Sequence, residues 1–323
     1  MEYRNLGRTG LKVSVLSYGA WVSFGNQIGV TEAAEILQRC RDAGVNFFDN
    51  AEVYANGKAE EIMGAAIKQL GWKRSDLVIS TKLFWGGNGP NDKGLSRKHI
   101  IEGVKASLKR LDMSYVDLLY CHRPDPSTPI EETVRAMNWV IDQGYAFYWG
   151  TSEWSAQQIT EAWEVAERLG LIGPAMEQPE YNLLVREKVE KEYAVLYKNY
   201  GVGLTTWSPL ASGVLTGKYM NGDIPEGSRF ALDNYKHLAT KSLVAETLEK
   251  VEALKPIAKE LDASLAQLAL AWCVKNPNVS SVISGATKLD QVVENMKALQ
   301  VVPKLTPEVM KRIDEAINLK ASK

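Results

Sequence analysis

The chain has little cysteine, little histidine and almost no net charge. Its 323 residues include three cysteines and three histidines, and 38 basic residues nearly balance 39 acidic ones. Cys40, Cys121 and Cys273 are odd in number, widely spaced and free of any CxxC pair, which argues against a disulfide framework and favours a reducing compartment. A formal charge of −1 provides no global field that would attract nucleic acid or an anionic membrane.

Long apolar runs are also missing. No hydrophobic stretch approaches the ~18 residues of a membrane-spanning helix, and the polar first five residues lack the apolar core of a secretion signal. We therefore expect a cytoplasmic protein with no nucleic-acid partner, no membrane insertion and no metal. No GxGxxG motif follows a predicted strand, which argues against a Rossmann dinucleotide site.

The chain instead shows apolar strand-like runs that alternate with helix-period segments. Strands are predicted at residues 13–18, 45–49, 77–82, 116–121, 146–150, 175–178, 202–206 and 279–284. Helices are predicted at 31–43, 59–70, 97–111, 130–143, 155–169, 187–200, 242–261, 264–275, 288–298 and 306–318, with a long irregular loop at 209–237. Eight βα units predict an α/β fold, a (β/α)8 TIM barrel. We expect one domain over residues 1–323, with a short N-terminal extension and extra C-terminal helices.

Three predicted strands end in an ionisable side chain: Asp49, Lys82 and His122. The carboxyl ends of parallel strands meet on one rim, where barrels place their chemistry. A lysine there needs a carboxylate nearby, and Asp49 ends the preceding strand. Tyr54, five residues after Asp49, supplies a phenol whose pKa a neighbouring cation lowers, and His122 supplies an imidazole for a substrate oxygen.

Each of these residues also has a structural interpretation when taken alone. Asp49 fits a helix or loop cap, His122 a satisfied structural histidine, and Tyr54 a ring packed over the barrel mouth. Lys82 is the hardest to explain without a function, because lysine is rarely buried. The joint pattern favours a proton donor of tuned acidity beside a group that orients a carbonyl.

The stretch 47–54 (Phe-Phe-Asp-Asn-Ala-Glu-Val-Tyr) resembles the segment of the aldo-keto reductase family that carries a catalytic Asp and Tyr. Residues 81–82 and 122–124 match the positions of its catalytic Lys and His, and residues 150–152 and 177–182 match its nicotinamide-contacting strand ends. The resemblance covers essentially the whole chain. It implies a (β/α)8 barrel that transfers hydride between NADPH/NADP+ and an aldehyde or ketone.

The same resemblance implies a role for each strand-end residue. Tyr54 would be the general acid, Lys82 would lower its pKa, Asp49 would position Lys82, and His122 would orient the carbonyl. Substrate would then contact Tyr54, Trp85 and His122. We further expect Trp21, Trp85 and Tyr120 to crowd the mouth of the site, where aromatic walls suit flat carbonyl compounds.

The family pattern also implies a cofactor site outside the strand ends. Gly285 admits close backbone approach before a predicted helix, which suits a phosphate. Trp207 fits either a ring near the nicotinamide or a core aromatic, and Lys218 and Arg229 fit either phosphate contacts or plain exposed cations. The implied cofactor-binding residues are Trp21, Gln27, Asp49, Ser152, Gln178, Trp207, Ser208, Pro209, Leu210, Ala211, Ser212, Lys218, Arg229, Gly285, Thr287, Gln291, Glu294 and Asn295.

Within that family the chain closely resembles the β subunits of voltage-gated potassium channels. The shared stretches are 52–55, 84–87, 94–103, 123–126, 146–154, 207–210 and 300–305. This implies a homotetramer and, as the alternative function, a cytoplasmic regulatory β subunit that binds a channel α subunit and uses NADPH as a redox sensor. The chain starts almost at the barrel, so we expect no channel inactivation by an N-terminal peptide.

Two departures from the family patterns bear on function. The animal channel β subunits have Asn where this chain has His122, and histidine is the ordinary choice of the reductases. This difference favours the enzyme over a purely regulatory protein. Many aldo-keto reductases have an arginine in the last cofactor-binding helix, whereas this chain has Gln291, which leaves open how strongly NADPH is preferred to NADH.

Overall fold

The computed structural model describes residues 1–318, which fall into two compact units. Unit 1 comprises Met1–Pro179, Glu187–Trp207 and Asn278–Val292. Unit 2 comprises Glu180–Arg186, Ser208–Pro277 and the chain from Val293 onward. The expectation of a single domain over residues 1–323 stays a prediction.

Unit 1 contains a closed barrel of eight parallel strands, which confirms the predicted (β/α)8 fold. The strands are β3 (Leu16–Gly19), β4 (Phe47–Asp49), β5 (Val78–Leu83), β6 (Val116–Cys121), β7 (Ala146–Ser152), β8 (Met176–Gln178), β9 (Gly203–Thr206) and β10 (Val279–Ser284). Each strand pairs with the next in chain order, and β10 closes the barrel against β3. The strands are almost entirely buried, as expected for parallel strands covered by helices.

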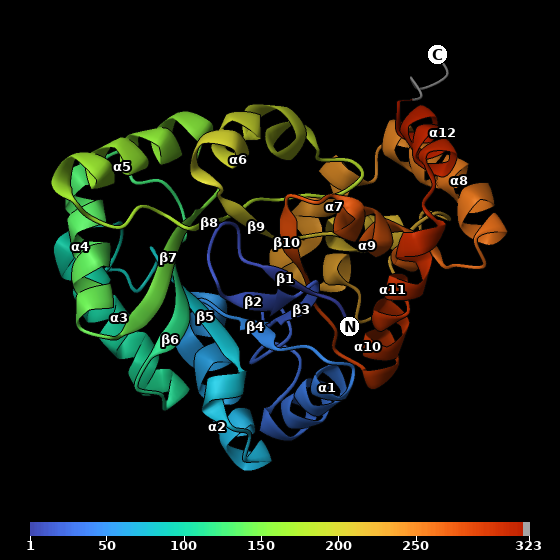
Figure 1. Ribbon diagram of the computed structural model, residues 1–323. Coiled ribbons are helices and arrows are strands. Elements are labelled where there is room, and N and C mark those ends of the chain that lie inside the picture. Colours follow the sequence, from blue (N-terminus) through green and yellow to red (C-terminus); the bar gives the residue numbers. More distant parts are fainter. Residues whose placement is uncertain (319–323) are drawn as a thin grey trace. The chain divides into compact units, whose positions relative to one another are not determined.

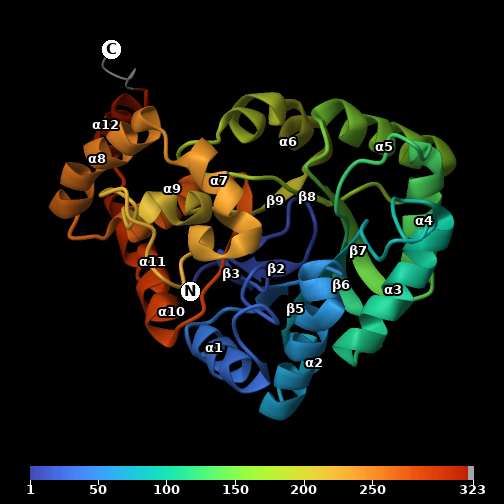
Figure 2. The ribbon, with the colours of Figure 1, turned by 180° about the vertical axis from the view of Figure 1, so that it is seen from behind.

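Helices cover the outer side of the barrel strands in unit 1 (Figure 1). They are α1 (Val30–Asp42), α2 (Lys58–Leu70), α3 (Arg97–Leu111), α4 (Ile130–Asp142), α5 (Ala156–Leu169) and α6 (Ala194–Tyr200). Local sequence sets their ends: Ser96 caps α3, and a capping box of Ser155 and Gln158 begins α5. Gly170 ends α5 in the left-handed conformation, with φ 65°. From behind, α2 to α5 again lie outside the strands (Figure 2).

An antiparallel hairpin precedes the barrel, formed by β1 (Tyr3–Asn5) and β2 (Lys12–Ser14). Leu6 and Val13 pack into one apolar cluster with Phe47 and Val78, which lie at the starts of their barrel strands. The hairpin therefore closes the N-terminal end of the barrel. The single strand predicted at 13–18 is wrong, because its first residues pair with β1 and only Leu16 onward joins the barrel.

Unit 2 consists mainly of helices. They are α7 (Lys236–Ser242), α8 (Ala245–Glu260), α9 (Leu265–Lys275), α11 (Ala298–Val301) and α12 (Pro307–Ile317), while α10 (Leu289–Met296) begins in unit 1 and ends in unit 2. Arg312 of α12 binds Glu260 of α8 with both guanidinium nitrogens, at 2.7 and 2.8 Å. Tyr181 packs on the ring of Trp272 in α9, with ring centroids 4.9 Å apart.

Three helical segments differ from the prediction. The segment 209–237 is not wholly irregular, because it contains 3-10 turns at Ala211–Thr216, Arg229–Ala231 and Asp233–Tyr235 and the start of α7. The helix predicted at 187–200 is divided into a π turn, Lys188–Glu192, and α6. The wider turn ends at Tyr193, whose buried hydroxyl donates to the carbonyl of Trp154 at 2.5 Å. The helix predicted at 288–298 is likewise divided, into α10 and α11.

None of the helices within residues 1–318 combines the length and the apolar character required to cross a membrane. Cys40, Cys121 and Cys273 are buried thiols. Burial raises the pKa of the Cys40 thiol to about 12, so this group stays protonated and unreactive at neutral pH.

Candidate active site

The predicted strand-end residues meet at the carboxyl end of the barrel. Asp49 ends β4, Lys82 is the penultimate residue of β5, and His122 directly follows β6. The registers pair Asp49 with Ser80 and Lys82 with Tyr120, so these strand ends lie side by side. Tyr54 lies just beyond β4, where it begins a short turn, Tyr54–Gly57.

Lys82 is the centre of a hydrogen-bonded cluster. Its side chain is 0% exposed, and its ammonium donates to Asp49 Oδ2 at 2.5 Å, to the Asn50 carbonyl at 2.8 Å and to Tyr54 Oη at 3.0 Å. An ammonium has three N–H donors, so all three are used. Because Tyr54 Oη accepts from Lys82, the phenolic proton is available to point elsewhere.

The Asp49 carboxylate is held from its other side as well. Its Oδ1 accepts from the Ser80 hydroxyl at 2.6 Å and from Gln178 Nε2 at 3.1 Å. Asp49 is therefore bound by three donors, and its position in turn determines where the Lys82 ammonium lies. A buried ion pair is weak evidence for stability, but this one places a cation beside a phenol.

Burial and charge act in opposite directions on this cluster. Burial raises the pKa of Tyr54, and the positive charge of Lys82 lowers it, with the net result above the ordinary value. Burial lowers the pKa of Lys82, but Asp49 and Tyr54 raise it by more. The charge of Lys82 thus lowers the pKa of Tyr54, as expected, but by less than burial raises it. At neutral pH Lys82 is therefore an ammonium and Tyr54 a neutral phenol.

His122 lies next to the phenol and is kept neutral. Burial, followed by the charges of Lys82 and Arg123, lowers the pKa of His122 well below its ordinary value. Its ring centroid is 5.8 Å from that of Tyr54 and 5.0 Å from that of Trp85. Its Nδ1 is buried and has no hydrogen-bond partner among residues 1–318. A buried polar atom without a partner calls for an explanation, and a bound water or ligand atom supplies one.

Asp49, Tyr54, Lys82 and His122 are called the tetrad from here on. The Aldo/keto reductase family matches residues 15–318, nearly the whole chain. The chain belongs to the aldo/keto reductase family. Members of this family are oxidoreductases that generally use NAD(P)H.

Two plant proteins are similar to this reductase-family chain over almost their full length. One, from Oryza sativa subsp. japonica, is 73% identical over 320 residues, which cover 99% of this chain and 98% of that protein. The other, from Arabidopsis thaliana, is 72% identical over the same coverage. Both carry the name "Probable voltage-gated potassium channel subunit beta".

Aromatic rings surround the tetrad of this aldo/keto reductase. Trp21 lies 6.4 Å from the Tyr54 ring and meets Trp207 edge-on at 5.8 Å between centroids. Trp207 is oriented by Glu153, whose Oε1 accepts from the indole nitrogen at 3.0 Å. Trp85 is 36% exposed beside His122. These contacts agree with the predicted aromatic mouth at Trp21 and Trp85.

The expectation that Tyr120 also crowds the mouth is wrong. Tyr120 is 0% exposed and belongs to the apolar cluster that the hairpin closes. Its hydroxyl is 2.8 Å from that of Thr205, a residue of β9. Tyr120 and His122 are two residues apart and so face the same side of the strand, the barrel interior; Tyr120 lies deeper because it is within β6, whereas His122 follows the strand end.

Unit 1 holds one group of the predicted cofactor residues: Trp21, Gln27, Asp49, Ser152, Gln178, Trp207, Gly285, Thr287 and Gln291. The structure brings three of them together, because Ser152 Oγ donates to the Gln178 carbonyl at 2.8 Å and Gln178 in turn binds Asp49. Gln27 lies in the exposed loop after β3, where its amide donates to the Val22 carbonyl at 3.1 Å.

The predicted phosphate loop after β10 has an open backbone approach. A methyl group added at Gly285 would meet only the Gly19 carbonyl, at 3.8 Å. Gln291 reaches back from α10, and its Oε1 accepts from the backbone nitrogens of Thr287 at 2.8 Å and Lys288 at 3.2 Å. The structure therefore assigns Gln291 a capping contact at the loop that was expected to hold the adenosine end of the cofactor.

Unit 2 holds the remaining predicted cofactor residues: Ser208, Pro209, Leu210, Ala211, Ser212, Lys218, Arg229, Glu294 and Asn295. Partial burial and the nearby charge of Arg229 both lower the pKa of Lys218. Two cations that lie close together favour a bound anion such as a phosphate. The Lys218 ammonium also lies over the turn at Gly213, where an added methyl group would approach it to 2.8 Å. These residues thus fit a phosphate-bearing cofactor.

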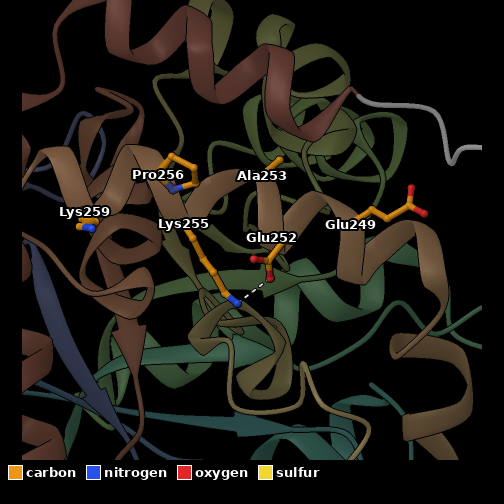
Figure 3. Close-up of a pocket in the computed structure, with 6 residues that line it drawn as sticks. All are labelled: Glu249, Glu252, Ala253, Lys255, Pro256 and Lys259. Carbon is orange, nitrogen blue, oxygen red and sulfur yellow. Dashed lines mark ion pairs between the residues drawn. The ribbon is translucent and has the colours of Figure 1, made fainter.

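Glu294 lies in the polar part of unit 2. Its Oε2 accepts from Gln267 Nε2 at 2.7 Å, and both residues line a pocket of about 440 Å³. Asn295 next to it is buried. A larger pocket, lined by six residues of α8 alone, contains none of the predicted site residues, and its Lys255 and Glu252 side chains turn toward each other in an ion pair of 2.5 Å (Figure 3).

The sequence interpretation gave no role to two residues at the barrel mouth. Arg123, which follows His122, donates from Nη1 to the His122 carbonyl at 2.5 Å and to Ser152 Oγ at 3.3 Å. Glu153 has a left-handed φ of 59° and binds Lys188 at 2.8 Å as well as Trp207. In the sequence, these two residues stand out by their positions directly after the predicted site residues His122 and Ser152.

Proposed function

We propose that this protein is an NADPH-dependent carbonyl reductase, in which Tyr54, Lys82, Asp49 and His122 are the catalytic residues. The observation that carries the proposal is the hydrogen-bonded series Asp49–Lys82–Tyr54 beside the unpartnered Nδ1 of His122. When bound, the nicotinamide cofactor supplies the hydride that reduces the carbonyl carbon. Within unit 1, Trp21, Gln27, Ser152, Gln178, Trp207 and the loop after β10 would hold it.

The side chains supply the proton and its control. A carbonyl oxygen that accepts from Tyr54 and contacts His122 is polarised, and it takes the Tyr54 proton as negative charge develops on it. The phenolate left on Tyr54 is stabilised by the Lys82 ammonium and regains its proton from solvent. One hydride and one proton thus convert an aldehyde to a primary alcohol or a ketone to a secondary alcohol, while the cofactor is oxidised.

The decisive test is the variant Tyr54→Phe, assayed by NADPH oxidation with an aromatic aldehyde and with NADH in parallel. We expect turnover to fall by a factor of about 100 or more, because the general acid is gone, while NADPH binding measured by fluorescence persists. Tyr3→Phe is the matched control, because the exposed Tyr3 hydroxyl only donates to the Gly44 carbonyl. Undiminished turnover in Tyr54→Phe would contradict the assigned acid.

The predicted phosphate contacts of Lys218 and Arg229 can be tested with both cofactors. The mutual proximity of these two cations supports a site for a phosphate of the cofactor. Lys218→Met should weaken the binding of NADPH, as measured by fluorescence titration of NADPH and of NADH; a larger loss for NADPH would place Lys218 at its extra phosphate. Equal weakening for the two cofactors would place Lys218 at a phosphate that both share.

A second function is favoured by the two plant relatives. Their names and their 72–73% identity over nearly the full length support the proposal that this chain also serves as a β subunit of a voltage-gated potassium channel. We propose a homotetramer on the cytoplasmic side of the membrane, bound to a channel α subunit, with bound NADPH as redox sensor. Co-purification with a channel and light scattering after sizing test it; a monomer that retains no channel would contradict it.

A further inference from the structure

Arg123 places a guanidinium on the wall of the barrel mouth. The residue is half-buried, and its Cζ lies 5.5 Å from the centre of the Trp85 ring. The Trp85 ring in turn meets His122 edge-on at 5.0 Å. The arginine, the exposed tryptophan and the catalytic histidine therefore form one continuous surface at the place where a carbonyl compound would enter.

The charge of Arg123 is not balanced by the protein. Lys82 and Asp49 neutralise each other, and no carboxylate within residues 1–318 lies within ion-pair distance of Arg123. The nearby Glu153 carboxylate is occupied by Lys188 and by the Trp207 indole. A half-buried arginine normally binds a carboxylate or a phosphate, often with two nitrogens.

Most of the donors of Arg123 remain available. An arginine has five N–H groups, and both hydrogen bonds that position this one are made by Nη1, to the His122 carbonyl and to Ser152 Oγ. These bonds fix the guanidinium between the ends of β6 and β7. The positive charge also acts at the reaction centre, since it lowers the pKa of both His122 and Tyr54.

We propose that Arg123 is a specificity determinant, and that the preferred substrates are carbonyl compounds that also carry a carboxylate. This inference rests on the proposed reductase function and narrows its substrate class. The carbonyl oxygen is placed by Tyr54 and His122, the body of the substrate lies against Trp85, and the carboxylate binds the guanidinium. A flat ring between the two groups suits the indole surface.

Two other roles for Arg123 would produce different results. If it only joins the ends of β6 and β7, its removal impairs all substrates equally. If it binds a phosphate of the cofactor, its removal weakens NADPH binding, again without regard to the substrate. Only recognition of a substrate anion changes the relative rates of a charged and an uncharged aldehyde.

The test compares para-carboxybenzaldehyde with its neutral methyl ester at saturating NADPH. We expect kcat/KM of the wild-type protein to favour the acid by roughly 10-fold or more, the effect of one charge-assisted interaction. Arg123→Met should bring the ratio to about one, whereas Arg123→Lys should keep part of it because it retains a cation. The wild-type preference should also shrink as salt screens the charge.

Arg8→Met is the matched control, because Arg8 also lies over an indole, 4.3 Å above Trp163, in the segment between β1 and β2. It should leave the ratio unchanged. Wild-type kcat/KM values that are equal for acid and ester, or a preference that survives in Arg123→Met, would overturn the proposal while the reductase function stands.

Absence of turnover with both aldehydes would instead contradict the reductase function. The charge recognition is then measured directly, by calorimetric binding of the acid and the ester to the protein with NADP+. Tighter binding of the acid that is lost in Arg123→Met supports the proposal, and equal binding of the two compounds overturns it.

Discussion

The two ends of the barrel in unit 1 are built in opposite ways. At the N-terminal end, Leu6 and Val13 of the hairpin seal an apolar cluster. At the carboxyl end, the buried groups include the Lys82–Asp49 ion pair. The loops after the strands there also contain non-glycine residues with a left-handed backbone: Val22 (φ 70°), Ala55 (φ 49°), Asn56 (φ 53°) and Glu153 (φ 59°).

This difference separates stability from chemistry. Burying apolar side chains at the N-terminal end stabilises the folded barrel. Buried charges and left-handed residues at the carboxyl end lower its stability. Backbone strain of this kind is typical of sites where geometry matters more than stability. Substitutions at the two ends should therefore affect different measurements.

The largest effect is expected for Lys82→Met. It removes the cation beside Tyr54 and leaves the Asp49 carboxylate buried without its partner. We expect a loss of about 3–5 kcal/mol in the free energy of unfolding, measured in urea, and a fall in turnover of about 100-fold or more.

The double variant Asp49→Asn with Lys82→Met separates the two losses. It should regain much of the stability, because no unpaired charge is buried, but none of the turnover. Lys68→Met is the matched control, since the exposed Lys68 binds the exposed Asp112 and solvent-exposed pairs contribute little to stability. Turnover near the wild-type value in Lys82→Met would contradict the assigned role.

At the opposite end, Leu6→Ala should affect stability alone. Leu6 is 0% exposed in the cluster with Phe47 and Val78, so we expect unfolding to become easier by about 2–4 kcal/mol. The kcat of the folded protein should stay within about twofold of the wild-type value, because Leu6 lies at the N-terminal end of the barrel, although the cluster extends to Tyr120, the register partner of Lys82. Val195→Ala, at a 44% exposed position of α6, is the control for both measurements. A parallel loss of kcat would show that the two ends are coupled.

The sequence predicted which residues lie at the carboxyl end of the barrel better than it predicted how those residues are arranged. Asp49, Lys82 and His122 were visible because each interrupts or ends a hydrophobic run, and the helix at 97–111 and the strand at 116–121 have the predicted bounds. Regular period and apolar content are local properties, so a single sequence reveals them.

Features that depend on distant partners were not predictable in this way. The division of the strand at Val15 depends on pairing with β1 and β10, and the inward position of Tyr120 depends on which face of β6 the barrel encloses. The orientation of Arg123 depends on the Ser152 hydroxyl and the Trp85 ring. None of these contacts leaves a periodic signal in the sequence.

A smaller, pH-dependent effect is expected at Glu177, which precedes Gln178 but binds Thr151 (2.5 Å) and Tyr193 (3.2 Å). Burial raises the pKa of Glu177 from 4.5 to about 8. Between these values the folded protein keeps a proton that the unfolded chain releases, so its contribution lowers stability as pH rises through this window.

Glu177→Gln removes the titration, because an amide does not ionise. The variant should gain in melting temperature relative to the wild-type protein by a few degrees between about pH 5 and about pH 8, measured by calorimetry. A difference between the two proteins that is constant over this range would show that Glu177 binds the same number of protons in the folded and unfolded states.

The smallest effect is expected for Ala55→Gly, which tests whether strain beside Tyr54 serves the chemistry. Glycine adopts the left-handed conformation of Ala55 (φ 49°, ψ 39°) without a steric penalty. Relief of strain outweighs the greater freedom of glycine in the unfolded chain, so we expect a gain of about 0.5 kcal/mol in unfolding free energy. Turnover should fall a few-fold, because the Tyr54 turn is held less firmly.

Ala43→Gly is the matched control for this change, because Ala43 ends α1 with an ordinary right-handed φ of −80°. With no strain to relieve, it should lose up to about 1 kcal/mol without a change in turnover. Urea unfolding and steady-state rates of both variants make the comparison. If Ala55→Gly is destabilised as much as Ala43→Gly, the turn is not strained. If Ala55→Gly is stabilised and keeps full turnover, the strain is present but does not help to position Tyr54. The two ends of the barrel then differ functionally through the buried charges alone.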